Sequence, residues 1–121
     1  MSTETELVKR HLVDPLRKGF PGSMVEKIAG TPYNKGLPDV VACIEGCSVW
    51  IEAKKEGNPL TALQRNKLRR HALADGVSLC VVFRKDGTMG VWDYTNQNRK
   101  LPINLGVLRR LLPLCVLTAE P

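Results

Sequence analysis

The stretch GLPDVVACIEGCSVWIEAKK, residues 36 to 55, decides the fold of this chain. The run VVACI is rich in β-branched residues, and the run SVWIEAKK follows it after the short segment EGC. Two such runs separated by a tight turn predict a β-hairpin. The hairpin also carries Asp39, Glu52 and Lys54 in or beside its apolar runs. Because an unpaired charge is costly to bury, these three residues either lie at an exposed rim or form a functional site.

The pairing of the hairpin decides how close these charges lie. If EG is a two-residue turn, Asp39 lies opposite Glu52, whereas a turn shifted by one or two residues sets Asp39 opposite Ala53 or Lys54. In each register the two carboxylates lie close together. Glu52 and Lys54 are two residues apart, so their side chains leave the same face of the strand.

This arrangement offers two carboxylates and the backbone carbonyl of Ala53 around one point, with an ammonium group beside them. Oxygen ligands of this kind suit a hard divalent cation such as Mg²⁺. Such a cation can polarise a phosphodiester and activate water, and Lys54 can orient that water or stabilise developing negative charge. The simpler alternative is a solvent-facing ion pair between Glu52 and Lys54, with Asp39 a turn residue after Pro38.

The remaining segments predict helices and strands on both sides of the hairpin. Thr3 and Glu6 match a capping box at the start of a helix that Pro15 kinks or ends near Asp14. SMVEKIA, residues 23 to 29, is a candidate short strand. A helix from about 62 to 75 precedes the strands VSLCVVF and MGVWDY, which are joined by the turn RKDGT. This order predicts one α/β domain, residues 1–121, with a mixed β-sheet flanked by helices.

The second helix carries one polar residue on its apolar side. Leu60, Gln64, Leu68 and Ala72 recur at four-residue spacing and form one stripe. Leu68 and Ala72 are expected to pack on the sheet, which turns Gln64 toward the charges of the hairpin. Gln64 also matches a capping box with Thr61, and the two roles can hold together.

The composition narrows the classes of partner and compartment. The 121 residues include 18 Lys and Arg against 12 Asp and Glu, and the formal net charge of +6 favours a polyanionic partner such as nucleic acid. The four cysteines lack metal-binding spacing, so zinc is not expected, and Cys43, Cys80 and Cys115 lie in apolar runs typical of a core. The N-terminus is polar, and no apolar run approaches the roughly 20 residues that span a bilayer. We therefore expect a cytoplasmic protein without a membrane partner.

The pattern GLPD, a short strand, IEAKKEGNPLTALQ, a helix and DGVSLCVVF resembles the VRR-NUC family, a branch of the PD-(D/E)XK nucleases. The resemblance covers about residues 4–84 in order and spacing. Pro38-Asp39 and Glu52-Ala53-Lys54 stand at the positions of the superfamily's motif, and LTALQ points to this branch. The resemblance implies a restriction-endonuclease-like fold and a DNA endonuclease that depends on Mg²⁺ or Mn²⁺.

The resemblance also implies roles for individual residues. Asp39 and Glu52 match the metal-binding acids of the family, and the carbonyl of Ala53 lies beside them. Lys54 matches the lysine that acts next to the attacking water, and Gln64 matches the glutamine that supports the site.

The family has a further acidic residue on its first helix. Glu6 is the better match for this metal ligand, and Glu4 is the second choice. Both residues equally suit the positive end of a helix dipole.

Stand-alone members of this family resemble phage or bacterial homodimers that cleave four-way DNA junctions. Resolving a junction needs two cuts in strands related by twofold symmetry, which a C2 dimer supplies. The tail LGVLRRLLPLCVL, in a segment expected to be partly helical, provides either the dimer interface or simple core packing. The resemblance thus implies a Holliday-junction resolvase in the cytoplasm of a bacterium or a phage-infected cell.

Basic residues surround the candidate site. The residues expected to hold DNA phosphates are Lys27, Lys35, Lys55, Arg65 and Arg69. Such contacts give sequence-independent and salt-sensitive binding. For Arg65 and Arg69 the alternative is ordinary solvation of an outer helix face.

Three functions compete for this sequence. The first is a metal-dependent endonuclease selective for branched DNA. The second is a non-catalytic nucleic-acid-binding protein that keeps the nuclease fold, although such a protein has no need of clustered carboxylates beside DNA phosphate. The third is a nuclease that acts on linear or nicked DNA, including a sequence-specific restriction-type enzyme, for which no recognition segment is evident.

Overall fold

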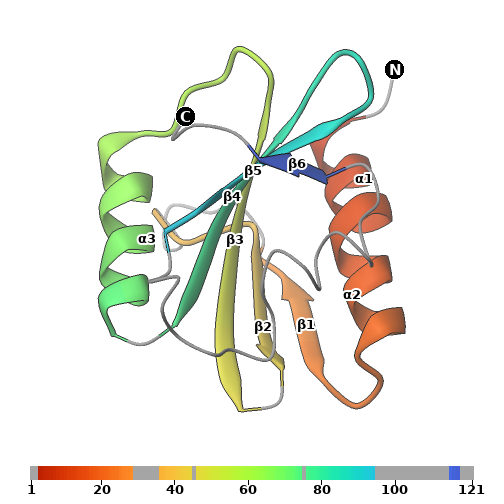
Figure 1. Cartoon of the computed structure of the whole chain (residues 1–121), viewed down its shortest axis with the longest axis vertical. Coiled ribbons are helices and arrows are strands. Elements are labelled where there is room, and N and C mark those ends of the chain that lie inside the picture. The colour runs from red at the N-terminus through yellow and green to blue at the C-terminus, as the bar shows by residue number, and fades with distance from the viewer. Residues whose placement is uncertain (1–2, 29–35, 45, 75, 95–114, 118–121) are drawn as a thin grey trace.

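A computed structural model of the chain describes residues 3–28, 36–44, 46–74, 76–94 and 115–117. Figure 1 shows a central β-sheet with the N-terminal helix on one face and α3 on the other. Over the described residues the sheet has six strands, and their spatial order β1-β2-β3-β4-β5-β6 follows their order in the chain. The prediction of an α/β fold with a mixed sheet flanked by helices is therefore confirmed.

The sheet contains both antiparallel and parallel strand pairs. They are β1 (Met24–Lys27), β2 (Val40–Ile44), β3 (Cys47–Lys55), β4 (Val77–Phe83), β5 (Met89–Asp93) and β6 (Cys115–Leu117). β3 pairs with β4 in parallel, and β5 pairs with β6 in parallel, while the other neighbours are antiparallel. A parallel pair needs a crossover connection, and α3 (Ala62–Leu73) provides it between β3 and β4.

The β2–β3 hairpin has the two-residue turn that the sequence offered as one of its registers. Ile44 pairs with Cys47 across the turn. Gly46 has a φ of 77°, a left-handed conformation that glycine adopts without a steric penalty. Continued beyond the last pair of the ladder, this register sets Asp39 opposite Glu52.

The N-terminal helix runs past the point where it was expected to end. It consists of α1 (Glu4–Val8), a π-helical turn (Lys9–Val13) and α2 (Asp14–Gly19), which Figure 1 shows as one continuous coil. The Asp14 N–H bonds the carbonyl of Lys9, five residues back. This wider turn accommodates Pro15, which lacks an N–H and would crowd a regular helical turn. Of the two outcomes predicted for Pro15, a kink or an end of the helix near Asp14, the end is therefore wrong, and the irregularity is a π-helical turn.

The two helical layers bury separate cores on the two faces of the sheet. The N-terminal helix contributes Val8, Leu12, Val13 and Leu16 to the larger core. On the opposite face, the smaller core contains Leu60, Leu68 and Cys80, with Trp50, Val82, Trp92 and Tyr94 packed against it.

The prediction that Cys43 lies in the core is wrong, because side chains alternate between the two faces of a strand. Val40, Ala42 and Ile44 point into the larger core, so Cys43 points the other way and is exposed. Cys80 is buried as predicted.

Of the C-terminal segment, the structure describes residues 115–117. Cys115–Leu117 forms β6, where a partly helical segment was expected. The rest of the LGVLRRLLPLCVL tail and Lys35 lie outside the described residues. In the described part of the chain, no helix has the length and apolar character needed to cross a membrane.

Candidate active site

The hairpin charges and the start of α3 meet near the end of β3. Asp39 directly precedes β2. Glu52 and Lys54 lie near the C-terminal end of β3, the strand that pairs with β2 in an antiparallel manner. Gln64 lies in the first turn of α3. The start of β2 and the end of β3 are neighbours because the two strands are antiparallel.

Glu52 is the residue around which the site is built. It is 3% exposed, and it is the one charged residue that is buried among the described residues. Gln64 Nε2 donates a hydrogen bond to Glu52 Oε1 over 3.3 Å. Lys54 Nζ lies 4.0 Å from the same oxygen, and both side chains are largely buried. The alternative of a solvent-facing ion pair between Glu52 and Lys54 does not fit this burial.

The surroundings of Glu52 oppose its negative charge. Burial is the largest cause that raises the pKa of Glu52 to about 9, followed by a side-chain hydrogen bond with Asp39 and the negative charge of Asp39. The positive charge of Lys54 opposes this pKa shift without cancelling it. A carboxylate in such a place needs additional positive charge before it can ionise near neutral pH. Strong perturbation of this kind is typical of functional sites.

Asp39 is held at both its backbone and its side chain. Its carbonyl accepts a 2.7 Å hydrogen bond from the N–H of Ile28, just after β1. Its Oδ2 accepts a 2.8 Å hydrogen bond from the N–H of Ala53 on β3. These two bonds fix the carboxylate beside the segment Glu52-Ala53-Lys54.

Gln64 contributes to both the helix start and the site. Its Oε1 accepts from the N–H of Thr61 over 3.0 Å, and its own N–H donates to Thr61 Oγ1 over 3.1 Å. This confirms the predicted capping box. Because the Nε2 group remains available, the same side chain also reaches Glu52. The two roles that the sequence left open are therefore both present in the contacts of Gln64.

The structure brings Glu4, rather than Glu6, toward the carboxylate pair. Glu6 is exposed, and its N–H is engaged by Thr3 Oγ1 at the helix start. Burial raises the pKa of Glu4, and the charge of Asp39 raises it further. The helix thus places Glu4, the second choice of the sequence, closer to the carboxylate pair than Glu6, and the identity of the additional metal-binding acid stays a prediction.

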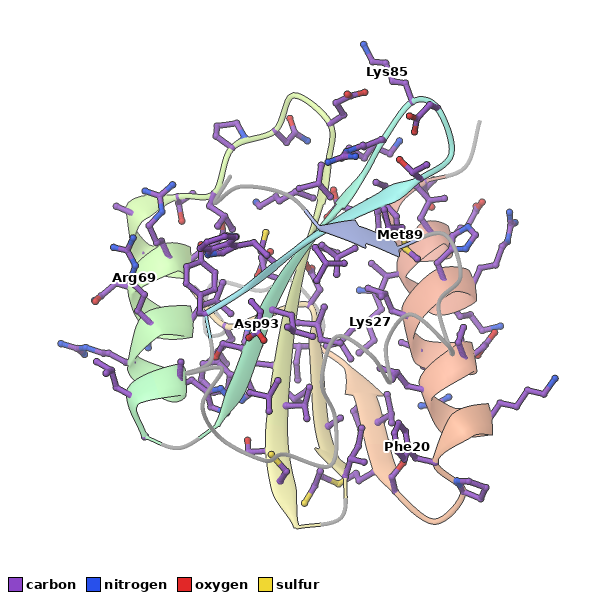
Figure 2. The ribbon with its side chains drawn as sticks, viewed as in Figure 1. Phe20, Lys27, Arg69, Lys85, Met89 and Asp93 are labelled. Carbon is purple, nitrogen blue, oxygen red and sulfur yellow. The ribbon has the colours of Figure 1, made fainter. Side chains whose placement is uncertain are left out.

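The predicted DNA-binding residues divide into two groups. Lys55 and Lys27 both act on the pKa of Glu4, and the charge of Arg65 acts on Cys80, which is paired with Glu52. These three basic residues therefore lie within electrostatic reach of the site. Arg69 is exposed on α3 (Figure 2).

A pocket of about 410 Å³ lies beside the site rather than at it. Its apolar lining comes from Leu7, Phe83 and Met89, between the N-terminal helix and the β4–β5 hairpin. Lys55 is part of the lining, but neither Asp39 nor Glu52 is.

The oxygen donors of the site match only part of what a divalent cation requires. No group of three or more His, Cys, Asp and Glu side chains suited to a metal occurs among the described residues. The site instead offers two carboxylates next to the backbone of Ala53. Mg²⁺ is commonly bound by one or two carboxylates, with waters and substrate phosphates completing its coordination. Burial and the neighbouring Asp39 raise the pKa of Glu52, and a bound cation would favour its ionised form. The residues present therefore fit such a cation.

The fold defines the structural class of this chain: it is an α/β protein with a restriction-endonuclease-like mixed sheet. Among solved structures, the fold is similar to that of Hjc, a Holliday junction resolvase from the archaeal hyperthermophile Archaeoglobus fulgidus, with a TM-score of 0.52. The two chains are 21% identical over 70% of this chain and 72% of Hjc. No protein-family model and no curated protein matches the sequence. At this identity the similarity shows a shared fold.

Proposed function

We propose that this chain is a metal-dependent, structure-selective DNA endonuclease of the VRR-NUC type. The observation that carries the proposal is the buried Glu52, whose carboxyl is hydrogen-bonded to Asp39 and lies within reach of Lys54 and Gln64. A protein that only binds nucleic acid gains nothing from two adjacent carboxylates, one of them buried, because carboxylates repel phosphate. A phosphodiesterase needs such a pair to hold a cation.

Each residue has a distinct part in this proposal. Asp39, Glu52 and the backbone carbonyl of Ala53 would hold Mg²⁺ or Mn²⁺, with Glu4 as the additional acid. The cation, when bound, supplies a Lewis acid for phosphodiester hydrolysis and neutralises the carboxylates. Lys54 orients the attacking water and stabilises negative charge that develops on the phosphate. Gln64 keeps Glu52 in one orientation through its Nε2 donor.

Branched DNA is the substrate that we propose, and a homodimer is the active form. Hjc, which shares the fold, is a Holliday junction resolvase, and this supports the choice. Two cuts related by twofold symmetry require two sites, which a C2 dimer provides. The basic residues Lys27, Lys55 and Arg65 lie near the site and suit phosphate contacts that are independent of sequence. We place this activity in the cytoplasm of a bacterium or a phage-infected cell.

A cleavage assay tests this function directly. Wild type and Asp39→Ala are incubated with a labelled four-way junction and with a linear duplex of the same sequence, each with Mg²⁺, Mn²⁺ or EDTA. We expect metal-dependent cutting of the junction by wild type and at least about a hundredfold slower cutting by the variant. Cutting of both DNAs would keep the nuclease and remove the junction preference. Binding without cutting under every condition would favour the non-catalytic alternative.

The same assay separates the two acids of the first helix. Glu4→Gln removes the negative charge that acts on Asp39 and Glu52, whereas Glu6→Gln changes an exposed residue in the same helical turn. We expect Glu4→Gln to raise the Mg²⁺ concentration needed for half-maximal cutting by about tenfold, in line with the loss of one supporting metal partner. Glu6→Gln is the matched control and is expected to need the wild-type concentration. Equal effects of both variants would contradict a special role for Glu4.

A further inference from the structure

The sheet face that carries Glu52 and Lys54 continues across the next two strands. Lys54 pairs with Val82 on β4, and Val82 pairs with Gly90 on β5. Val82 packs against the core under α3, while Met89 and Val91, on either side of Gly90, belong to the core on the opposite face. By strand alternation, Lys54, Val82 and the open side of Gly90 therefore form one row on the α3 face.

Arg84 uses the space that Gly90 leaves on this face. A Cβ atom placed on Gly90 would lie 2.8 Å from Arg84 Nη2 and 3.2 Å from both Cζ and Nε. The guanidinium therefore lies directly over the backbone of Gly90, where any other residue would carry a side chain. A glycine inside the apolar run MGVWDY, paired with a strand that an arginine directly follows, is the sequence signal for such a close approach.

The β4–β5 turn fixes the backbone from which this side chain leaves. The N–H of Arg84 donates to the carbonyl of Thr88 over 2.9 Å, and the carbonyl of Arg84 accepts from the N–H of Gly87 over 3.1 Å. Arg84 is one of the causes that lower the pKa of Asp86, but hydrogen bonds from the hydroxyl and the N–H of Thr88 come before it. The Asp86 carboxylate is thus already engaged by Thr88, and the Arg84 guanidinium stays directed over Gly90.

The position of Arg84 suits a phosphate next to the one that is cut. Neighbouring strands are about 4.8 Å apart, so β5 lies roughly 10 Å from β3 on this face. A DNA strand whose scissile phosphate lies at Lys54 can therefore bring an adjoining phosphate toward the guanidinium. Arginine binds phosphate through two parallel N–H donors, and a side chain seated on a glycine loses less freedom on binding.

We propose that Arg84, seated on Gly90, is a phosphate-binding residue that holds the DNA strand beside the catalytic carboxylates. This proposal rests on the proposed function, because it assumes that DNA lies across the α3 face at Lys54. A purely structural arginine, which only covers the glycine, is the competing explanation. The two explanations differ in what they predict for the salt dependence of DNA binding.

The test measures binding of the four-way junction in EDTA, where no cutting occurs, across a series of NaCl concentrations. We compare wild type with Arg84→Gln, with Gly90→Ala and with the control Lys85→Gln. Lys85 is the neighbouring residue, and Figure 2 shows its side chain pointing away from the sheet. Loss of one phosphate contact lowers the slope of log K against log salt by about 0.9, which corresponds to roughly eightfold weaker binding at about 0.1 M salt.

Arg84→Gln removes the guanidinium, and the alanine Cβ of Gly90→Ala displaces it, so both variants are expected to show this decrease in the slope of log K against log salt. The decrease for Lys85→Gln is expected to be smaller. A wild-type slope for a folded Arg84→Gln, or equal losses for Arg84→Gln and Lys85→Gln, would overturn the proposal while leaving the nuclease intact. Failure of the wild-type chain to bind DNA at all would instead count against the proposed function itself.

Discussion

The contact between β3 and α3 has polar side chains at both of its ends. At one end they have neutral hydrogen-bond partners, whereas at the other end a buried acid lies next to a second acid. At one end, the His71 ring stacks on Trp50 with 4.2 Å between centroids and an interplanar angle of 7°. Its Nε2 lies 2.8 Å from Ser48 Oγ, and its Nδ1 lies 2.7 Å from Ser78 Oγ. At the other end, Glu52 is buried beside Asp39, another acid. The two ends are separated by only two turns of α3.

The difference between these ends teaches how a structural polar cluster can be told from a functional one. Burial lowers the pKa of His71, which favours the neutral ring, and each of its nitrogens has a hydroxyl partner. Burial raises the pKa of Glu52, and the negative charge of Asp39 raises it further, while the positive charge of Lys54 opposes this shift without cancelling it. A cluster that is complete without a ligand stabilises the fold. A cluster of acids whose negative charge is not balanced by the protein favours a ligand that carries positive charge.

The largest expected effects are a loss of activity from a substitution at the Glu52 end and a loss of stability from a substitution at the His71 end. Lys54→Ala removes the ammonium group beside Glu52 and is expected to slow cleavage by about 10²–10³-fold with little loss of stability. His71→Ala removes the stacking on Trp50 and the hydrogen bond between His71 Nδ1 and the hydroxyl of the buried Ser78. We expect it to lower the free energy of unfolding by about 2–4 kcal/mol.

Denaturant unfolding and junction cleavage, measured on the same two variants, test this division. The folded fraction of His71→Ala should cut DNA at close to the wild-type rate. If His71→Ala, while folded, lost as much activity as Lys54→Ala, the histidine end would belong to the catalytic machinery and the comparison would fail.

Sequence patterns predicted the end at Glu52 better than the end at His71. The tight turn fixes the register of the hairpin, so the closeness of Asp39 and Glu52 follows from local chemistry. The four-residue spacing of α3 likewise turned Gln64 toward Glu52. The stacking of His71 on Trp50 depends on how the helix lies across the sheet, and no local pattern encodes that angle.

The first helix shows a similar limit of local patterns. Both Glu4 and Glu6 suit a helix start, so the choice between them depends on how the helix rotates about its axis against the sheet. That rotation is set by packing of the larger core, with Val8, Leu12 and Leu16 as its contributors. The π-helical turn before Pro15 shifts this packing in a way that a regular helical period does not describe.

The next largest effect is the dependence of protein stability on pH and on metal, which follows from the pKa of Glu52. The pKa of this carboxyl is about 9 in the folded, metal-free protein, above its ordinary value of 4.5. Between these values the folded chain holds one proton more than the unfolded chain. Its contribution to stability is therefore complete below the lower value and is lost as pH rises toward the higher one, at up to about 1.4 kcal/mol per pH unit.

Thermal unfolding with EDTA or Mg²⁺, at about pH 6 and about pH 8, measures this linkage. Because the cation binds the ionised carboxylates, it should raise the Tm more at the higher pH. Glu52→Gln should lose both the decrease in Tm with rising pH in EDTA and the increase in Tm with Mg²⁺, while Glu6→Gln keeps both. An equal Mg²⁺ effect in Glu52→Gln and wild type would place the cation elsewhere.

The smallest effect divides the two roles of Gln64. Thr61→Ala removes the hydroxyl that caps α3 but leaves the Gln64 donor to Glu52 in place, so it should cost about 1 kcal/mol of stability and little activity. Gln64→Glu keeps an acceptor for the Thr61 N–H and suits the helix dipole, but it replaces the donor to Glu52 with a third carboxylate. We expect this variant to keep wild-type stability at neutral pH with metal present and to cut about tenfold more slowly, as for loss of a supporting partner. If the two variants instead lost stability equally and both kept full activity, the bond from Gln64 to Glu52 would be a by-product of capping, and the site would end at the hairpin.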